Sequence, residues 1–194
     1  MARWDRAGRA LKTLADSLPG FEDDVLLLKV AAVNELYTTN LFDVQGMAEH
    51  IASLISRQPP RTPDLVDEIA ALPEPGRQRR FLSFASKFVH FFMDESFPSY
   101  DAYALSSLWR HLGNHPAGRA PSYAEFFEDV YRLRELASVA CSVGELGQYL
   151  WLSGAYGRWK RNPAQISREA AGVFSSSSPE VRTDLDGLVG NAQA

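Results

Sequence analysis

FLSFASKFVHFFMDESFPSYDAYAL, residues 81–105, joins an aromatic segment to the start of a second helix. The aromatic segment runs from Phe81 to about Phe92 and is apolar at helical spacing, which predicts a buried helix. Lys87 lies within it, and burying an ammonium group is costly unless the charge is paired or reaches water. The stretch therefore predicts two consecutive helices, the first of which carries a charge among aromatic side chains.

The second helix has two candidate residues at its start, Ser99 and Asp101. Ser99 is the expected N-cap, because its hydroxyl can accept a hydrogen bond from the first turn. Asp101 then falls in that turn, near the positive end of the helix dipole. One interpretation makes Asp101 and Lys87 functional residues. The other makes Asp101 a helix-stabilising acid and Lys87 a side chain that reaches the surface.

The rest of the chain shows helical spacing and no trustworthy strand or internal repeat. Pro19-Gly20 and Pro59-Pro60 end helices, and capping boxes are expected at Ser122 with Glu125 and at Ser142 with Glu145. The helix expected at residues 22–37 is apolar nearly all round, and such a helix usually lies at the centre of a bundle. The fold class is therefore all-α, a bundle of about eight helices, expected at residues 5–17, 22–37, 43–56, 62–72, 81–92, 101–115, 122–140 and 145–160.

Length and composition predict one helical domain over residues 1–174 and a polar C-terminal tail over 175–194. The 194 residues are 45% hydrophobic, which suffices for one packed core. The tail opens with a run of serines and is sparse in apolar residues, so we expect it to be mobile or loosely docked.

Several classes of protein are disfavoured. One cysteine, Cys141, excludes a disulfide framework and favours the reducing cytoplasm. The N-terminus has no signal-peptide core, and the longest apolar run, interrupted by Lys29, is too short to span a bilayer. A formal net charge of −4 argues against a broad nucleic-acid coat but leaves room for a local basic face.

Residues 72–76, Leu-Pro-Glu-Pro-Gly, form a predicted turn between two helices and precede Arg77, Arg79 and Arg80. This pattern is typical of a helix-hairpin-helix, in which backbone N–H groups of the turn hold a phosphate. The alternative is an ordinary corner between helices with solvated arginines.

Two further segments carry a resemblance. Residues 36–51, LYTTNLFDVQGMAEHI, resemble the segment of 8-oxoguanine-type DNA glycosylases in which an asparagine-rich run opens a helix. Residues 97–101, FPSYD, look like the Pro-Val-Asp helix start that carries the catalytic aspartate of the helix-hairpin-helix DNA glycosylase superfamily. The order of asparagine loop, hairpin, buried helix and aspartate matches over roughly residues 25–112. The resemblance implies a glycosylase-like fold and excision of a base from DNA.

The departures from the family pattern carry information as well. Bifunctional members have a lysine directly after the hairpin, whereas this chain has Gln78 near that place and Lys87 about two helical turns further on. This predicts a monofunctional enzyme. The pattern around Lys87 and Asp101 looks closest to small bacterial glycosylases of phage defence, which implies glucosylated hydroxymethylcytosine in phage DNA as the target.

The resemblance assigns a role to each candidate residue. Excision requires the base to be flipped out of the stack. Asp101 would stabilise the positive charge that develops at C1′ and orient a water, with Lys87 near it. Asn40 would fill the vacated stack, and the residues expected to hold the DNA backbone are Gly76, Arg77, Arg79 and Arg80. Aromatic surfaces suit a flipped base, although each aromatic residue is also a candidate core residue; the predicted pocket is Tyr37, His90, Phe91, Trp151 and Tyr156.

No metal or cofactor is expected. His111 and His115 have a spacing that suits a metal, but no third ligand is evident. The predicted partner is double-stranded DNA with a modified base, bound by a monomer in the cytoplasm. Two alternatives remain open, namely a non-catalytic helical interaction module and a protein that binds damaged DNA without excising a base.

Overall fold

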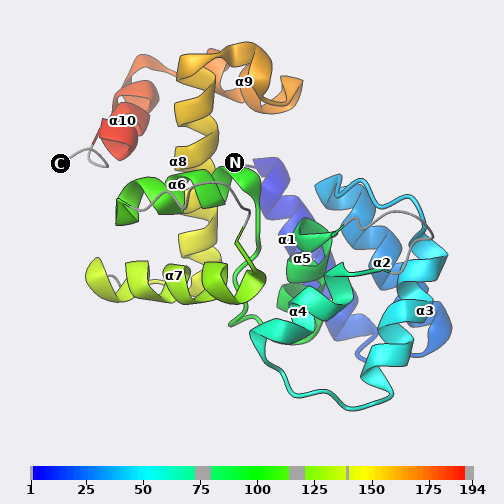
Figure 1. Ribbon diagram of the computed structural model, residues 1–194. Helices are drawn as coiled ribbons and strands as arrows, with labels where there is room; N and C mark the ends of the chain where they lie inside the picture. The colour runs from blue at the N-terminus through cyan, green and yellow to red at the C-terminus, as the bar shows by residue number, and fades with distance from the viewer. Residues whose placement is uncertain (1, 73–79, 114–120, 139, 191–194) are drawn as a thin grey trace. The chain divides into compact units, whose positions relative to one another are not determined.

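The computed structural model describes residues 2–72, 80–113, 121–138 and 140–190, and these residues are helical without a strand. The all-α prediction is therefore confirmed, with ten α-helices in the described residues where about eight were expected (Figure 1). The helices are α1 (Ala2–Ser17), α2 (Asp23–Tyr37), α3 (Val44–Ile55), α4 (Pro63–Ala70), α5 (Leu82–Phe92), α6 (Ala102–Leu112), α7 (Tyr123–Leu136), α8 (Val143–Arg161), α9 (Arg168–Ser176) and α10 (Pro179–Gly190), with a short 3-10 helix, η1 (Pro163–Gln165), after α8.

The chain divides into two compact units. The first comprises residues 1–99 and 122–127, and the second comprises residues 100–121 and 128–194. Helix α7 begins in the first unit and continues in the second. The sequence predicted one domain over residues 1–174, and that boundary stays a prediction.

The first unit is built from α1 to α5 around a core of aliphatic and aromatic side chains. Helix α5 contacts α1, α2 and α4, and α2 also contacts α3. Phe84 and Phe88 of α5 are fully buried, with their ring centroids 5.9 Å apart. The predicted burial of this aromatic helix is therefore confirmed.

Helix α2 differs from its prediction. Its apolar residues were expected to be buried on all sides, but Leu27, Leu28 and Leu36 are 40%, 49% and 43% exposed. The physical reason is that α1, α3 and α5 pack only against the face that carries Leu26 and Val30.

A buried lysine of α2 shows how this unit accommodates a charge. Lys29 is 1% exposed, and its Nζ donates a hydrogen bond to the Gly20 carbonyl at 2.7 Å. The ammonium also lies 4.5 Å and 5.0 Å from the ring centroids of Phe21 and Phe92. Burial lowers the pKa of Lys29, opposed by the nearby Glu22 carboxylate. A carbonyl and two ring faces thus replace part of the lost hydration.

The second unit is organised along α8, which contacts α6, α9, α10 and η1 (Figure 1). The capping box predicted at its start is present, with Ser142 and Glu145 exchanging hydrogen bonds with each other's backbone. Helix α8 can approach α6 closely because residue 154 is glycine. A Cβ there would lie 2.0 Å from the carbonyl oxygen of Tyr103.

Part of the predicted C-terminal tail is helical. Within residues 175–194, α10 spans Pro179–Gly190, and Leu185 is 7% exposed in a cluster with Tyr156, Ile166 and Phe174. The Asp186 carboxylate accepts hydrogen bonds from the Tyr156 hydroxyl and Lys160 at 2.8 Å and 2.7 Å. Leu185 therefore packs α10 against this cluster, together with the partly buried Leu188 and Val189.

Candidate functional site

The segment between α4 and α5 holds the predicted hairpin. Its ends are joined by a backbone hydrogen bond from Phe81 N to the Ala70 carbonyl, at 2.8 Å. The end of α4 and the start of α5 therefore lie side by side. Three predicted phosphate-binding residues, Gly76, Arg77 and Arg79, lie outside the described residues.

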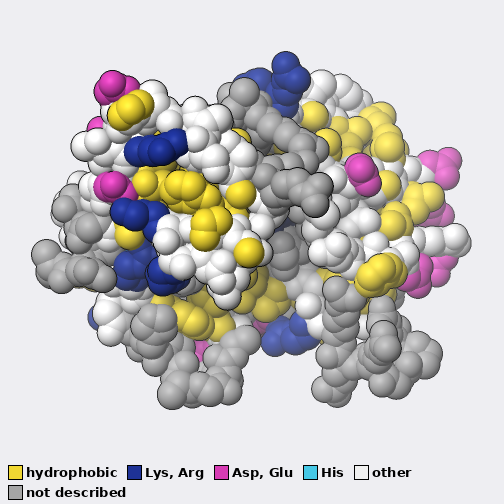
Figure 2. Space-filling view, turned by 90° about the horizontal axis from the view of Figure 1, so that it is seen from above, with side chains coloured by type: hydrophobic (Ala, Val, Ile, Leu, Met, Phe, Trp, Pro, Cys, Tyr) yellow, Lys and Arg dark blue, Asp and Glu magenta, His cyan; other side chains and the backbone are white. Residues whose placement is uncertain are grey.

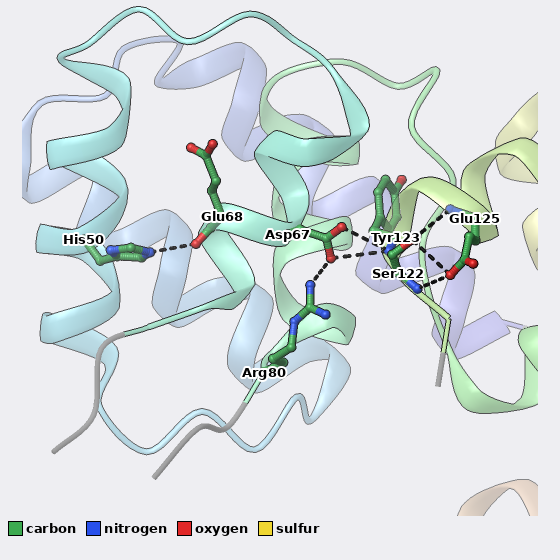
Figure 3. A network of polar contacts seen from close by, with 7 residues as sticks. All are labelled: His50, Asp67, Glu68, Arg80, Ser122, Tyr123 and Glu125. Carbon is green, nitrogen blue, oxygen red and sulfur yellow. Dashed lines mark hydrogen bonds and ion pairs between the residues drawn. The ribbon is translucent and has the colours of Figure 1, made fainter. Parts of the chain in front are cut away.

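Arg80 is engaged within the protein. Its guanidinium forms a short ion pair with the Asp67 carboxylate of α4. The same carboxylate accepts the backbone N–H of Tyr123 at 3.2–3.3 Å (Figure 3). Asp67 thus links Arg80 to the start of α7, and the predicted contact of Arg80 with DNA would compete with this pair.

The start of α7 is itself held by a capping box. Ser122 N donates to the Glu125 carboxylate at 2.8 Å, and Glu125 N donates to the Ser122 hydroxyl at 3.2 Å. This confirms the sequence prediction. Asp67 and the capping box thus provide acceptors for Tyr123 N and Glu125 N, two of the first N–H groups of the helix, which have no partner inside the helix.

Lys87 does not reach the surface. It is 3% exposed, and its Nζ donates hydrogen bonds to the Ser83 hydroxyl and carbonyl, at 2.9 Å and 3.2 Å. The ammonium lies 5.6 Å from the ring centroid of Tyr37. The alternative in which Lys87 extends to solvent is wrong, because one turn of α5 and an aromatic ring provide its surroundings.

Three predicted pocket residues, Tyr37, His90 and Phe91, belong to the first unit. The rings of Tyr37 and Phe91 are 5.7 Å apart, and burial raises the pKa of Tyr37 to about 12. His90 meets Phe91 edge to face, and its Nδ1 bonds the Phe97 carbonyl at 2.8 Å. Burial lowers the pKa of His90, so the neutral imidazole is favoured. Tyr37, Phe91 and Lys87 thus form one aromatic and cationic cluster.

The asparagine loop between α2 and α3 is organised by a residue that the sequence analysis did not select. The Asn34 side chain accepts from Thr39 Oγ1 and Leu41 N and donates to the Leu41 carbonyl, at 2.8–3.0 Å. Asn40 is exposed at the turn with a φ of 57°, a conformation that asparagine tolerates well. The structure therefore presents Asn40 outward.

Phe42 is a second residue that the sequence analysis passed over. It is 80% exposed, two positions after Asn40 and directly before Asp43, which caps α3. The feature of the sequence that could have pointed to Phe42 is an aromatic residue between a turn and the N-cap of a helix. A ring this exposed at a loop tip is a candidate for contact with another molecule.

Asp101 belongs to the second unit and is the N-cap of α6, where its carboxylate accepts the Tyr103 N–H at 2.7 Å. The prediction that Ser99 caps this helix is wrong. The carbonyls of Phe97 and Pro98 are held by His90 and by the Tyr123 hydroxyl, so the chain stays extended up to Asp101. The side chain of Asp101 is half-buried.

The other two predicted pocket residues, Trp151 and Tyr156, lie on α8. Trp151 is half-buried and meets Tyr103 edge to face, with 6.1 Å between the ring centroids. Tyr156 is buried, stacks on Trp159 and meets Phe174 edge to face. Burial and Asp186 raise the pKa of Tyr156 to about 12. Tyr156 therefore serves the core of the second unit, as the structural interpretation of these aromatics anticipated.

The remaining candidates carry little chemistry. Within the described residues, no three His, Cys, Asp or Glu side chains gather as a metal site. His111 contacts the Tyr149 hydroxyl at 3.0 Å, and His115 lies outside the described part of the chain. Cys141 is a half-buried thiol. No helix in the described ranges combines the length and apolarity needed to cross a membrane.

Comparisons with known proteins give a partial match. Residues 2–96 match the family model HI_0787_N, described as an N-terminal domain. A protein of Haemophilus influenzae, named "Uncharacterized protein", is 28% identical over 129 residues, which are 62% of this chain and 62% of that protein. No solved structure matches the chain. The similarity to the family model thus covers α1 to α5.

Proposed function

We propose that this protein is a monofunctional DNA glycosylase of the helix-hairpin-helix superfamily. It would flip a modified base out of duplex DNA and hydrolyse the bond between the base and C1′. The proposed target is glucosylated hydroxymethylcytosine in phage DNA, and the proposed setting is anti-phage defence in the cytoplasm. The bundle would then be the glycosylase-like variety of the all-α class.

The supporting observation is the order of elements. Helices α4 and α5 flank a connection whose ends are joined by the Phe81–Ala70 backbone bond, and a carboxylate, Asp101, caps the next helix. The Asp101 carboxylate accepts the Tyr103 N–H at 2.7 Å and lies at the positive end of the helix dipole. In this proposal the carboxylate faces the positive charge that develops at C1′ in the transition state.

Asn40 and Phe42 extend the proposal to the space that the flipped base leaves in the DNA stack. Both are exposed on the loop between α2 and α3. Proteins that open the base stack insert apolar or polar side chains at the opened step. In this proposal Phe42 enters the stack beside Asn40.

The test uses a duplex with one glucosylated hydroxymethylcytosine and a matched duplex with cytosine. We expect alkali-labile breaks only in the modified duplex, and no breaks before alkali. Asp101→Asn separates the two roles of Asp101, since asparagine caps a helix as well as aspartate does. We expect this variant to fold normally and to lose excision.

The matched control is Asp43→Asn at the N-cap of α3, where Asp43 accepts the Gly46 N–H at 2.7 Å. It removes a carboxylate from the same kind of position and should leave excision intact. Wild-type activity in Asp101→Asn, or no alkali-labile site with wild type, would refute the proposal.

A non-catalytic interaction module is the second candidate. Its favouring observations are the ion pair that occupies Arg80 and the exposed Leu27, Leu28 and Phe42. Such a module has no salt-dependent affinity for DNA, whereas contacts to phosphates give a steep dependence. A protein that only recognises damaged DNA would bind with that dependence and leave the DNA alkali-stable.

A further inference from the structure

Helix α2 has an apolar stripe on the side that its neighbours leave uncovered. Leu28, Ala32 and Leu36 follow one another at i, i+4 spacing, and Leu27 and Ala31 form a second row beside them. The three leucines are 40–49% exposed, and the two alanines are half-buried. These five side chains are the α2 stripe. A contiguous apolar surface of this kind is typical of a contact site for another molecule.

The α2 stripe suits the packing of a second helix. Ala31 and Ala32 lie along the axis between Leu28 and Leu36. A large side chain of an approaching helix can therefore rest over the alanines, between the two leucines, as in ridges-into-grooves packing. From residue 27 to residue 36 the stripe is about 14 Å long, which matches the i, i+4 and i+7 contacts of a helix bound in a groove.

The charge around the α2 stripe is of one sign. Residues 18–56, which contain α2 and α3, have six acidic residues and one lysine, a formal charge of −5, whereas the whole chain has −4. That lysine is Lys29, which is 1% exposed and bonds the Gly20 carbonyl. The acidic residues are all exposed, and they are Glu22, Asp23, Asp24, Glu35, Asp43 and Glu49. The surface of α2 and α3 is therefore acidic.

Two of these acids lie at the ends of the stripe. Asp24 is four residues before Leu28, and Glu35 is four residues after Ala31, so each continues one of the two rows. Within the part of the chain that the structure describes, neither carboxylate takes part in an ion pair. Figure 2 shows acidic side chains beside hydrophobic ones on the surface of the first unit, on the right of the view.

This charge pattern discriminates between possible occupants of the stripe. In an antiparallel pair of α2 helices, Asp24 of one copy would face Glu35 of the other, and in a parallel pair each acid would face its own counterpart. Like charges across an interface are unfavourable, which disfavours a second copy of this chain. Nucleic-acid backbones and anionic lipid surfaces are repelled for the same reason. A basic partner is attracted.

We infer that the α2 stripe binds a basic amphipathic helix of another protein. The apolar face of that helix would pack on the three leucines, and its flanking lysines or arginines would pair with Asp24 and Glu35. Burial of the leucines supplies the affinity, because it removes apolar surface from water. The charges supply orientation and a faster encounter. The inference depends neither on Asp101 nor on base excision.

The test uses two synthetic helical peptides of about 20 residues, long enough to form a helix in water. Both carry leucines along one helical face. One has lysines beside that face, and the other has glutamates in the same places. Fluorescence anisotropy measures the binding of each peptide to the full chain. We expect the lysine peptide to bind, with an affinity that falls as salt rises, and the glutamate peptide not to bind.

Substitution of the leucines locates the binding surface. Leu28→Ala combined with Leu36→Ala should weaken binding of the lysine peptide at least about tenfold, because the peptide would bury the surface that both leucines leave in water. The variant should fold, since both side chains are about half exposed and alanine favours a helix. Leu136→Ala is the matched control, because Leu136 of α7 is 67% exposed, and it should bind the peptide like wild type.

Substitution of the acids tests the charge. Asp24→Asn combined with Glu35→Gln should weaken binding of the lysine peptide and reduce its dependence on salt. Glu128→Gln is the matched control, because Glu128 is exposed on α7. Sedimentation of the free chain tests the second-copy alternative, and we expect a species that the leucine substitutions leave unchanged.

Three outcomes overturn the inference. The first is a wild type that does not bind the lysine peptide or binds both peptides equally. The second is undiminished binding after substitution of Leu28 and Leu36. The third is a dimer of the free chain that dissociates on that substitution, which would assign the α2 stripe to a second copy.

Discussion

At the scale of single residues, Asp67 joins three segments of the first unit. Its carboxylate pairs with Arg80 and accepts the Tyr123 N–H, while α4 carries it (Figure 3). We expect Asp67→Ala to lower the free energy of unfolding by about 1–3 kcal/mol, because it leaves polar partners unsatisfied. Urea denaturation measures the change.

The control for this prediction is Glu68→Ala on the same helix. The Glu68 side chain is exposed, and only its backbone carbonyl is used, by His50 at 2.9 Å. That variant should stay within about 0.5 kcal/mol of wild type. Equal effects of the two substitutions would show that Asp67 is not a structural link.

His90 makes stability depend on pH. Burial lowers the pKa of His90 in the folded protein below 6.5, the ordinary value that it has in the unfolded chain. Between the folded pKa and 6.5 the unfolded chain therefore binds more protons than the folded one. Stability therefore rises with pH in that window and is lost as pH falls from 6.5 toward the folded pKa. His90→Asn keeps a donor for the Phe97 carbonyl but does not titrate. We expect wild type to lose more stability than this variant between pH 7.5 and 5.5.

In the comparison of His90→Asn with wild type, the contributions of the other titrating groups to the pH dependence of stability cancel. His111, whose pKa is also lowered, titrates in both proteins and drops out of the difference. From pH 8.5 to 7.5 the free energy of unfolding should change with pH equally in the two proteins, because these pH values lie above the range in which His90 titrates. Identical slopes down to pH 5.5 as well would contradict the buried neutral His90.

At the scale of elements, the packing of α6 on α8 depends on Gly154. Its Cβ would lie 2.0 Å from the Tyr103 carbonyl, and backbone cannot yield as a side-chain end can. We expect Gly154→Ala to destabilise the protein by about 1–3 kcal/mol or more, through overpacking. Thermal unfolding reports the change.

Gly147 provides the matched control on the same helix. A Cβ there meets nothing within 4 Å. Gly147→Ala should therefore raise stability by about 0.5–1 kcal/mol, because alanine loses less backbone freedom in a helix. Destabilisation by both substitutions would point to a property of α8 itself rather than to its contact with α6.

At the scale of the whole molecule, α10 packs on the second unit through Leu185. Leu185 is buried among Tyr156, Ile166 and Phe174, whereas Val181 on the same helix is 47% exposed. We expect Leu185→Ala to cost about 2–5 kcal/mol, as for other buried leucines. Val181→Ala should cost far less. A loosely docked tail would instead make both substitutions neutral in urea denaturation.

Much of the helical framework was readable from the sequence. Proline and glycine breaks placed most helices, and the capping boxes of α7 and α8 were found because they need only two residues three positions apart. The cap of α6 was misplaced by two residues. Ser99 and Asp101 are both good caps, and the choice was made by His90 and Tyr123, which hold the preceding carbonyls.

The candidate site could be read only in part. Residue type and order along the chain singled out Asn40, Lys87 and Asp101. The sequence did not show that Arg80 pairs with Asp67, because Asp67 lies thirteen positions away along the chain, and the phosphate contact of Arg80 stays a prediction. Local spacing cannot show such a pairing.

The sequence by itself determined that this protein is a helical one, because turn signals and helical periodicity depend on near neighbours alone. The tertiary structure decided which charges are buried, which aromatic rings belong to the core and which apolar face of α2 remains exposed. Those outcomes depend on segments that meet only after packing. Gly154 shows the difference most clearly, since the need for a glycine at this position becomes visible only when α6 lies against α8.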